Sequence, residues 1–198
     1  METLLTFIFN LIYASYNAVI ALLAHSLWFL ASSAFYAVLA VTKLAVLIPS
    51  FHAIRIEGKA DGAFMLKATG LLLLALDAAL SAVLYGNLAS GKATKYDEII
   101  MLTIATYVFA RITANIVKAV SRQRDKSPGM TALRTIGYAE VAVSVLTLQR
   151  SMIATYNTDM AFEQIHLMNT LSGAAVSLFI VILGISLIRK GKWLNRKS

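Results

Sequence analysis

The stretch LLLLALDAALSAVLYGNL, residues 71–88, decides the class of protein to which this chain belongs. It is almost wholly apolar, yet Asp77 lies near its centre. As a helix, about 20 apolar residues are long enough to cross the ~30 Å hydrocarbon core of a lipid bilayer. In a water-soluble protein the same stretch would form a buried core helix, and the acidic residue would be a misfit. The composition of the whole chain distinguishes these two cases.

Composition places the chain among membrane proteins. Of its 198 residues, 59% are hydrophobic and 14% are charged, whereas a soluble domain has about 25% charged residues. There is no cysteine, which excludes a disulfide framework and a cysteine-ligated metal site. Two prolines and ten glycines are too few for a loop-rich or all-β fold. We therefore expect an all-α, polytopic transmembrane helical bundle that forms a single integral membrane domain over residues 1–198.

Five segments are long and apolar enough to cross a membrane: residues 27–49, 64–88, 98–120, 131–155 and 167–188. The polar stretches 52–62, 89–95 and 122–129 between them are typical of turns. An earlier apolar segment, residues 3–24, carries polar residues on one helical face but no lysine or arginine. Because helices in the membrane interface usually carry basic residues, we expect this segment to span. The bundle then has about six spans, or five if residues 3–24 are interfacial.

The 18 lysine and arginine residues are distributed unevenly about these spans. Most lie in or beside residues 52–62 and 122–129 and in the C-terminal tail, whereas Lys92, Lys95 and Arg150 lie at the opposite ends of the spans. Loops rich in basic residues face the cytoplasm. We therefore predict a multi-pass protein of the bacterial cytoplasmic membrane with both termini in the cytoplasm. The net charge of +8 then reflects topology and attraction to anionic lipid headgroups, and no nucleic acid partner is expected.

Four ionisable residues lie well inside the expected spans: Lys43, Asp77, Arg111 and Glu140. A charge at the centre of a spanning helix costs about 2.5–3.5 kcal/mol on insertion scales, so such residues avoid lipid. Two of the four are basic and two are acidic, and all lie in one band from mid-membrane toward the cytoplasm. We therefore expect them to form an intramembrane polar core, with Asp77 facing Arg111 or Lys43.

Polar residues share helical faces with these four charges. Tyr36 lies on the face of Lys43, Ser81 on that of Asp77, Tyr107 and Asn115 on that of Arg111, and Ser144 on that of Glu140. The face of Glu140 continues as a polar stripe through Gly137, Thr147 and Ser151. On the last segment, Thr170, Gly173, Ser177 and Gly184 form a small-residue face, which allows neighbouring helices to approach closely. These faces predict helices that pack around a polar interior.

The sequence favours one hypothesis for function and leaves one alternative open. The first is a small transporter or channel-like protein for an ion or small solute, in which Asp77 or Glu140 is the protonatable acid and Arg111 its counter-charge. The second is a non-catalytic membrane subunit or scaffold whose buried charges are structural. A transport pathway predicts a water-accessible cavity touching at least two of the four charges, whereas a sealed and fully paired network favours the scaffold.

An enzymatic function has no recognisable catalytic set in this sequence, and we expect neither a cofactor nor a metal. Glu163 and His166 have the spacing of one half of a di-iron carboxylate motif, but such sites need two such pairs and further glutamates. The expected partners are the lipid bilayer, an ion or small solute, and either a second copy of the chain or another membrane protein.

Three stretches resemble an uncharacterised family of small multi-spanning bacterial membrane proteins, found mainly in Gram-positive bacteria. They are SLWF with the following FY and Lys43 (26–43), LTLQRSM (146–152) and HLMNTLSG (166–173). The resemblance implies a class and a bacterial source, but no activity is assigned to that family. A small or apolar residue is expected there in place of Glu140, and an amide in place of Asp77. The resemblance therefore does not extend to a charge-paired mechanism.

Overall fold

The computed structural model describes residues 33–43, 59–90, 98–121, 127–156 and 161–196, together with Ser15 and Val19. Within the helices, some side chains lie outside this description: those of residues 59–61, 87–90, 98–100, 103, 104, 107, 111, 115, 118–121, 154 and 162. The regular structure of the described part is entirely α-helical, without a strand. This confirms the all-α prediction. Apart from Ser15 and Val19, the predicted first span, residues 3–24, lies outside the described residues.

A short helix and four long ones account for the described chain. The short helix is Ser33–Lys43, and the long helices are α3 (Lys59–Ser90), α4 (Glu98–Ser121), α5 (Pro128–Tyr156) and α6 (Phe162–Arg196). Each of the four long helices contains or matches one segment predicted from hydropathy. Two of them, α3 (Gly62–Gly86) and α6 (Glu163–Arg196), contain stretches that are long and apolar enough to cross a membrane.

The helix ends differ from the predicted segment ends. α3 begins at Lys59, inside the predicted turn 52–62, and α6 continues to Arg196, eight residues beyond the predicted end at 188. The predicted turn 122–129 contains the start of α5, where Pro128 is the first helical residue and the hydroxyl of Ser127 accepts the backbone N–H of Met130 at 3.3 Å. Proline suits this position because its missing N–H would have no partner inside the helix.

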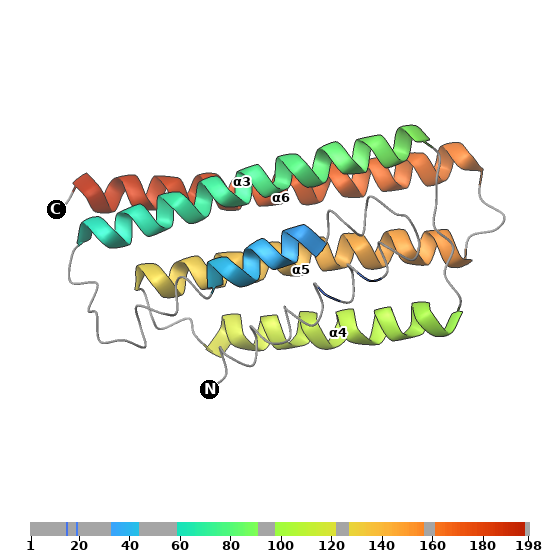
Figure 1. Ribbon diagram of the computed structural model, residues 1–198, viewed down its shortest axis with the longest axis horizontal. Coiled ribbons are helices and arrows are strands. Elements are labelled where there is room, and N and C mark those ends of the chain that lie inside the picture. The colour runs from blue at the N-terminus through green and yellow to red at the C-terminus, as the bar shows by residue number, and fades with distance from the viewer. Residues whose placement is uncertain are drawn as a thin grey trace.

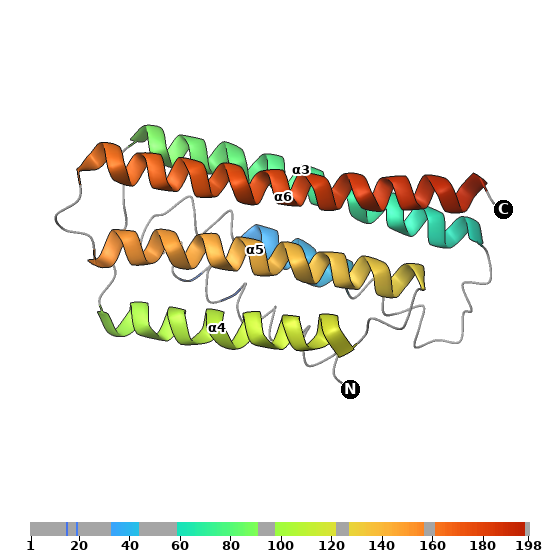
Figure 2. The same ribbon diagram turned by 180° about the vertical axis from the view of Figure 1, so that it is seen from behind.

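The long helices lie side by side with alternating directions. α3 and α6 run antiparallel along one side of the molecule, α4 lies on the opposite side, and α5 lies between (Figure 1). The same order is seen from behind in Figure 2. α5 contacts α3, α4 and α6, and α3 makes its most extensive contact with α6. The short helix Ser33–Lys43 lies against α5 (Figure 1), and its Tyr36 and Lys43 side chains contact that helix.

Glycines allow the close approach of α3 and α6. A Cβ atom added at Gly70 would lie 2.7 Å from the carbonyl oxygen of Gly184, and one added at Gly191 would lie 2.8 Å from the carbonyl oxygen of Ala63. Gly173 is also buried, against Leu84. Gly173, Ser177 and Gly184 of the predicted small-residue face therefore pack against α3, whereas Thr170 is exposed.

The bundle has an apolar core and an apolar exterior. The core includes Phe35, Leu39, Leu73, Ile136 and Ile180, all almost fully buried. Large apolar side chains also cover the outside of the long helices: Phe64, Leu71, Tyr85, Leu102, Phe109, Leu171, Leu178 and Ile182 are each more than half exposed. Water-soluble monomers rarely expose large continuous apolar surface, and so many exposed apolar side chains are typical of a helix bundle in lipid.

Candidate functional site

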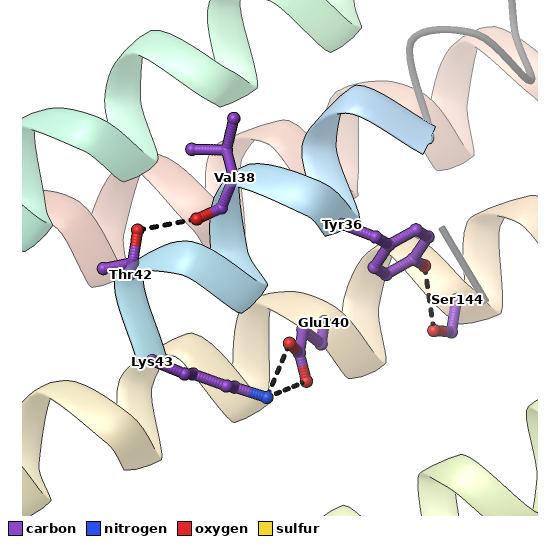
Figure 3. Close-up of polar contacts among 6 residues, drawn as sticks. All are labelled: Tyr36, Val38, Thr42, Lys43, Glu140 and Ser144. Carbon is purple, nitrogen blue, oxygen red and sulfur yellow. Dashed lines mark hydrogen bonds and ion pairs between the residues drawn. The ribbon is translucent and has the colours of Figure 1, made fainter. Parts of the chain in front are cut away.

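Two buried charges of the described chain, Lys43 and Glu140, form an ion pair. Lys43, the last residue of the short helix, places its Nζ 2.6 Å from Oε1 and 2.7 Å from Oε2 of Glu140 on α5 (Figure 3). The two side chains are 6% and 0% exposed. Hydrogen bonds between oppositely charged groups are short and about twice as strong as neutral ones. The pair therefore ties the short helix to the middle of α5.

A neutral hydrogen bond joins the same two helices about two turns of the short helix away. The hydroxyl groups of Tyr36 and Ser144 are 3.0 Å apart, and both side chains are fully buried (Figure 3). Tyr36 precedes Lys43 by two helical turns, whereas Ser144 follows Glu140 by one turn. The two contacts therefore run in opposite directions along the two helices, and together they specify an antiparallel register.

The polar stripe predicted on α5 faces the interior. Thr147 and Ser151 are buried, as Glu140 and Ser144 are. The hydroxyl of Thr147 donates to the backbone carbonyl of Val143 at 2.8 Å, which satisfies it within its own helix. α5 therefore presents a continuous polar surface to the centre of the bundle, as the spacing of these residues indicates.

A second polar site lies between α3 and α6. The Asp77 carboxylate, which is buried, accepts a hydrogen bond of 2.7 Å from the hydroxyl of Ser177. Ser81 donates in turn to the hydroxyl of Ser177 at 3.3 Å. Ser81 and Asp77 are one turn apart on α3, so the three side chains form a short hydrogen-bonded chain along the helix contact. No basic side chain completes this chain among the residues that the structure describes.

The described residues of the predicted polar core form two separate sets of contacts. Lys43 and Glu140 come together as expected, with Tyr36 and Ser144 beside them. Asp77 is hydrogen-bonded to Ser177, and not to Lys43, which was one of its two expected partners. The side chains of Arg111, Tyr107 and Asn115 lie outside the described residues. The backbone of α4 contacts α5, whereas no contact between α3 and α4 occurs in the described part of the chain.

The sequence did not single out Ser177 as a partner for an acid. Ser177 shares the small-residue face of α6 with Gly173 and Gly184. This shared face was the only feature of the sequence that indicated a helix contact at Ser177. A further contact between α5 and α6 was also missed, in which the side-chain amide of Gln149 donates to the hydroxyl of Ser172 at 2.5 Å.

The histidine and acidic residues do not gather into a larger cluster in the described chain. Glu163 and His166 are exposed at the start of α6. Among the described residues there is no group of three or more histidine, aspartate or glutamate side chains placed to hold a metal ion.

One described cavity lies away from both polar sites. It is a groove of about 480 Å³ between α5 and α6, and its lining includes Arg134, Tyr138, Lys190 and Trp193. Neither the Lys43–Glu140 pair nor Asp77 contributes to it.

Comparison with known proteins adds no assignment. No family model, curated protein or solved structure matches the chain. The resemblance to a family of small bacterial membrane proteins therefore stays a prediction, and function has to be argued from the site.

Proposed function

We propose that the chain is a multi-pass integral membrane protein that folds as an α-helical bundle in the bacterial cytoplasmic membrane. The observation that carries this proposal is the distribution of polarity. Side chains such as Leu71 on α3 and Leu178 on α6 are 61% and 62% exposed. Lys43 and Glu140 are buried. Apolar residues outside and paired polar residues inside are what a lipid environment requires, because lipid cannot solvate a charge.

The basic residues support an orientation with the C-terminus in the cytoplasm. α3 and α5 begin at the end of the bundle where α6 finishes (Figure 1). The last turns of α6 carry exposed Arg189, Lys190, Lys192 and Arg196 at this end. Basic residues close to the ends of spans are retained on the cytoplasmic side. An even number of spans then puts the N-terminus on the same side.

Within the membrane, the described geometry favours the scaffold hypothesis over transport. The Lys43–Glu140 pair is sealed from solvent, and the cavity described between α5 and α6 does not reach it. Buried polar pairs are best attested as devices that fix the register of helices. We therefore assign the protein the role of a non-catalytic membrane subunit or scaffold, with this pair holding its helices in one arrangement.

Transport of an ion or small solute is the second candidate, and Asp77 is the observation that favours it. A mid-helix carboxylate whose described partner is the hydroxyl group of Ser177 has no lysine or arginine to displace before it binds a proton or a small cation. This distinguishes it from Glu140, which already holds a lysine.

A flux measurement separates the two candidates. Purified protein is placed in liposomes, and ion and proton movement is followed with and without a pH gradient. The scaffold assignment predicts no flux above that of protein-free liposomes for the wild type, and an Asp77→Asn variant that changes only folding yield. Transport would replace the scaffold assignment if three results occur together. The wild type shows flux, Asp77→Asn abolishes that flux, and the double variant Lys43→Met/Glu140→Met retains it.

A further inference from the structure

The groove between α5 and α6 combines an open cavity with two cationic side chains. Its volume is about 480 Å³, within the range of roughly 300–1,000 Å³ typical of small-molecule sites. Arg134 projects from α5 and Lys190 from α6, and no acidic residue lines the groove among the described side chains. The described lining therefore carries two positively charged side chains, which favour an anionic ligand.

The lining combines basic, hydroxyl and apolar side chains. Trp193 and Lys190 lie in the last two turns of α6, and Arg134 lies within the first two turns of α5. Tyr138 follows Arg134 by about one turn on α5, and Leu183 precedes Lys190 by about two turns on α6. A small free anion needs only the basic part of such a groove. An amphiphile, with a charged head and an apolar body, matches all of it.

The groove also lies where the proposed orientation puts the cytoplasmic lipid headgroups. Trp193 is 57% exposed at the rim, and tryptophan and tyrosine favour the boundary between headgroups and acyl chains. Basic pockets between spanning helices on the cytoplasmic side are suited to anionic lipid headgroups. The guanidinium of arginine presents a planar set of donors that fits phosphate oxygens, and lysine adds a point charge.

We propose that this groove binds the phosphate-bearing headgroup of an anionic phospholipid, with Arg134 and Lys190 on the phosphate and Tyr138, Leu183 and Trp193 along the glycerol and first acyl methylenes. This inference rests on the proposed membrane location. It is independent of the choice between scaffold and transport. The proposal assigns a specific lipid ligand to the groove at the start of α5 and the end of α6, in addition to the general attraction between basic residues and a charged membrane surface.

Quenching of Trp193 fluorescence tests the proposal. The chain contains two tryptophans, so a Trp28→Phe background leaves Trp193 as the reporter. The protein is placed in phosphatidylcholine nanodiscs that contain a minor fraction of acyl-brominated phosphatidylglycerol or, in a parallel sample, acyl-brominated phosphatidylcholine. We expect stronger quenching by the anionic lipid, and we expect Arg134→Gln and Lys190→Gln each to lower that preference about fivefold.

Arg189→Gln is the matched control, because Arg189 precedes Lys190 on α6, is exposed and does not line the groove. It should leave the preference within about twofold of the background protein. An equal loss in Arg189→Gln and Lys190→Gln would show that surface charge alone attracts the lipid, and would overturn the proposal. Lys190 is exposed, so its variant remains informative even if Arg134→Gln does not fold.

The remaining outcomes separate this inference from the membrane proposal. Equal quenching by both brominated lipids would reject the headgroup site while leaving a membrane protein. No quenching by either lipid would contradict the membrane location itself. Relief of quenching by millimolar inorganic phosphate would show that the site takes free phosphate, and would also reject the lipid proposal.

Discussion

The Lys43–Glu140 pair permits a quantitative prediction, because its two members can be removed singly or together. Lys43→Met and Glu140→Met each remove one charge while keeping an unbranched side chain of similar length. Each single variant leaves the opposite charge in a site where its side chain is 6% or 0% exposed. The double variant leaves two apolar side chains in contact and no buried charge.

The size of the effect follows from the burial and the distances. Two unit charges about 4 Å apart attract by roughly 4 kcal/mol at an effective dielectric constant near 20, and these atoms are 2.6 and 2.7 Å apart. Removing one partner of a buried pair costs about 3–5 kcal/mol, whereas replacing both by packed apolar residues is often neutral or stabilising. We expect each single variant to lose about 3–5 kcal/mol of unfolding free energy. The double variant should lie within about 1 kcal/mol of the wild type, or above it.

Reversible unfolding in mixed micelles of dodecyl maltoside and sodium dodecyl sulfate, followed by circular dichroism, measures these free energies. Lys192→Met is the control, since it makes the same substitution at an exposed position on α6 and should change stability by less than about 0.5 kcal/mol. The reasoning is refuted if Lys43→Met costs no more than Lys192→Met. It is also refuted if the double variant costs the sum of the two single variants.

Three further predictions use the same unfolding assay. Gly70→Ala should lower the unfolding free energy by about 1–3 kcal/mol, because the added Cβ atom would lie 2.7 Å from a backbone carbonyl oxygen of α6. Gly86→Ala is the control: its added Cβ atom would have nothing within 4 Å, so stability should be unchanged or rise by up to about 1 kcal/mol. Equal effects of the two substitutions would contradict the close contact of α3 and α6. Ser177→Ala should cost about 1–3 kcal/mol by removing a donor to the buried carboxylate of α3, and a loss below about 0.5 kcal/mol would speak against that bond. Tyr36→Phe should lower the unfolding free energy by about 1 kcal/mol. Adding Ser144→Ala should lower it little further, because the same hydrogen bond is lost in both cases. Additive losses would show that the two hydroxyl groups are not partners.

The positions of the helices were predictable from the sequence, whereas their ends were not. An apolar run of about 20 residues, bounded by polar residues, locates each long helix. Hydropathy marks the part of a helix that tolerates lipid, not the part that is hydrogen-bonded as a helix. This is why α3 begins at Lys59 and α6 reaches Arg196, both beyond their apolar stretches. At residues 122–129 the polar composition indicated a turn, but Pro128 is also a favourable first residue of a helix.

The interior faces were predictable because helical geometry decides which residues share a face. The stripe of Glu140 and Ser144 on α5 is buried as its spacing indicates. Which helix meets which face depends on the packing order of the bundle, and one sequence does not contain that information in local form. Gly70 and Gly184 bring α3 against α6, and this contact places Asp77 beside Ser177, a partner that the sequence did not indicate.

Single-cysteine labelling tests the central claim, that this chain spans a lipid bilayer with its apolar side chains outward. The chain has no cysteine, so each introduced thiol is a unique reporter. Leu178→Cys lies at an exposed apolar position near the middle of α6, and Arg196→Cys at its basic end. In inside-out membrane vesicles, a water-soluble maleimide should label Arg196→Cys readily and Leu178→Cys only after the membrane is dissolved in detergent and the protein unfolded. Equal labelling of the two cysteines in intact vesicles would contradict the account.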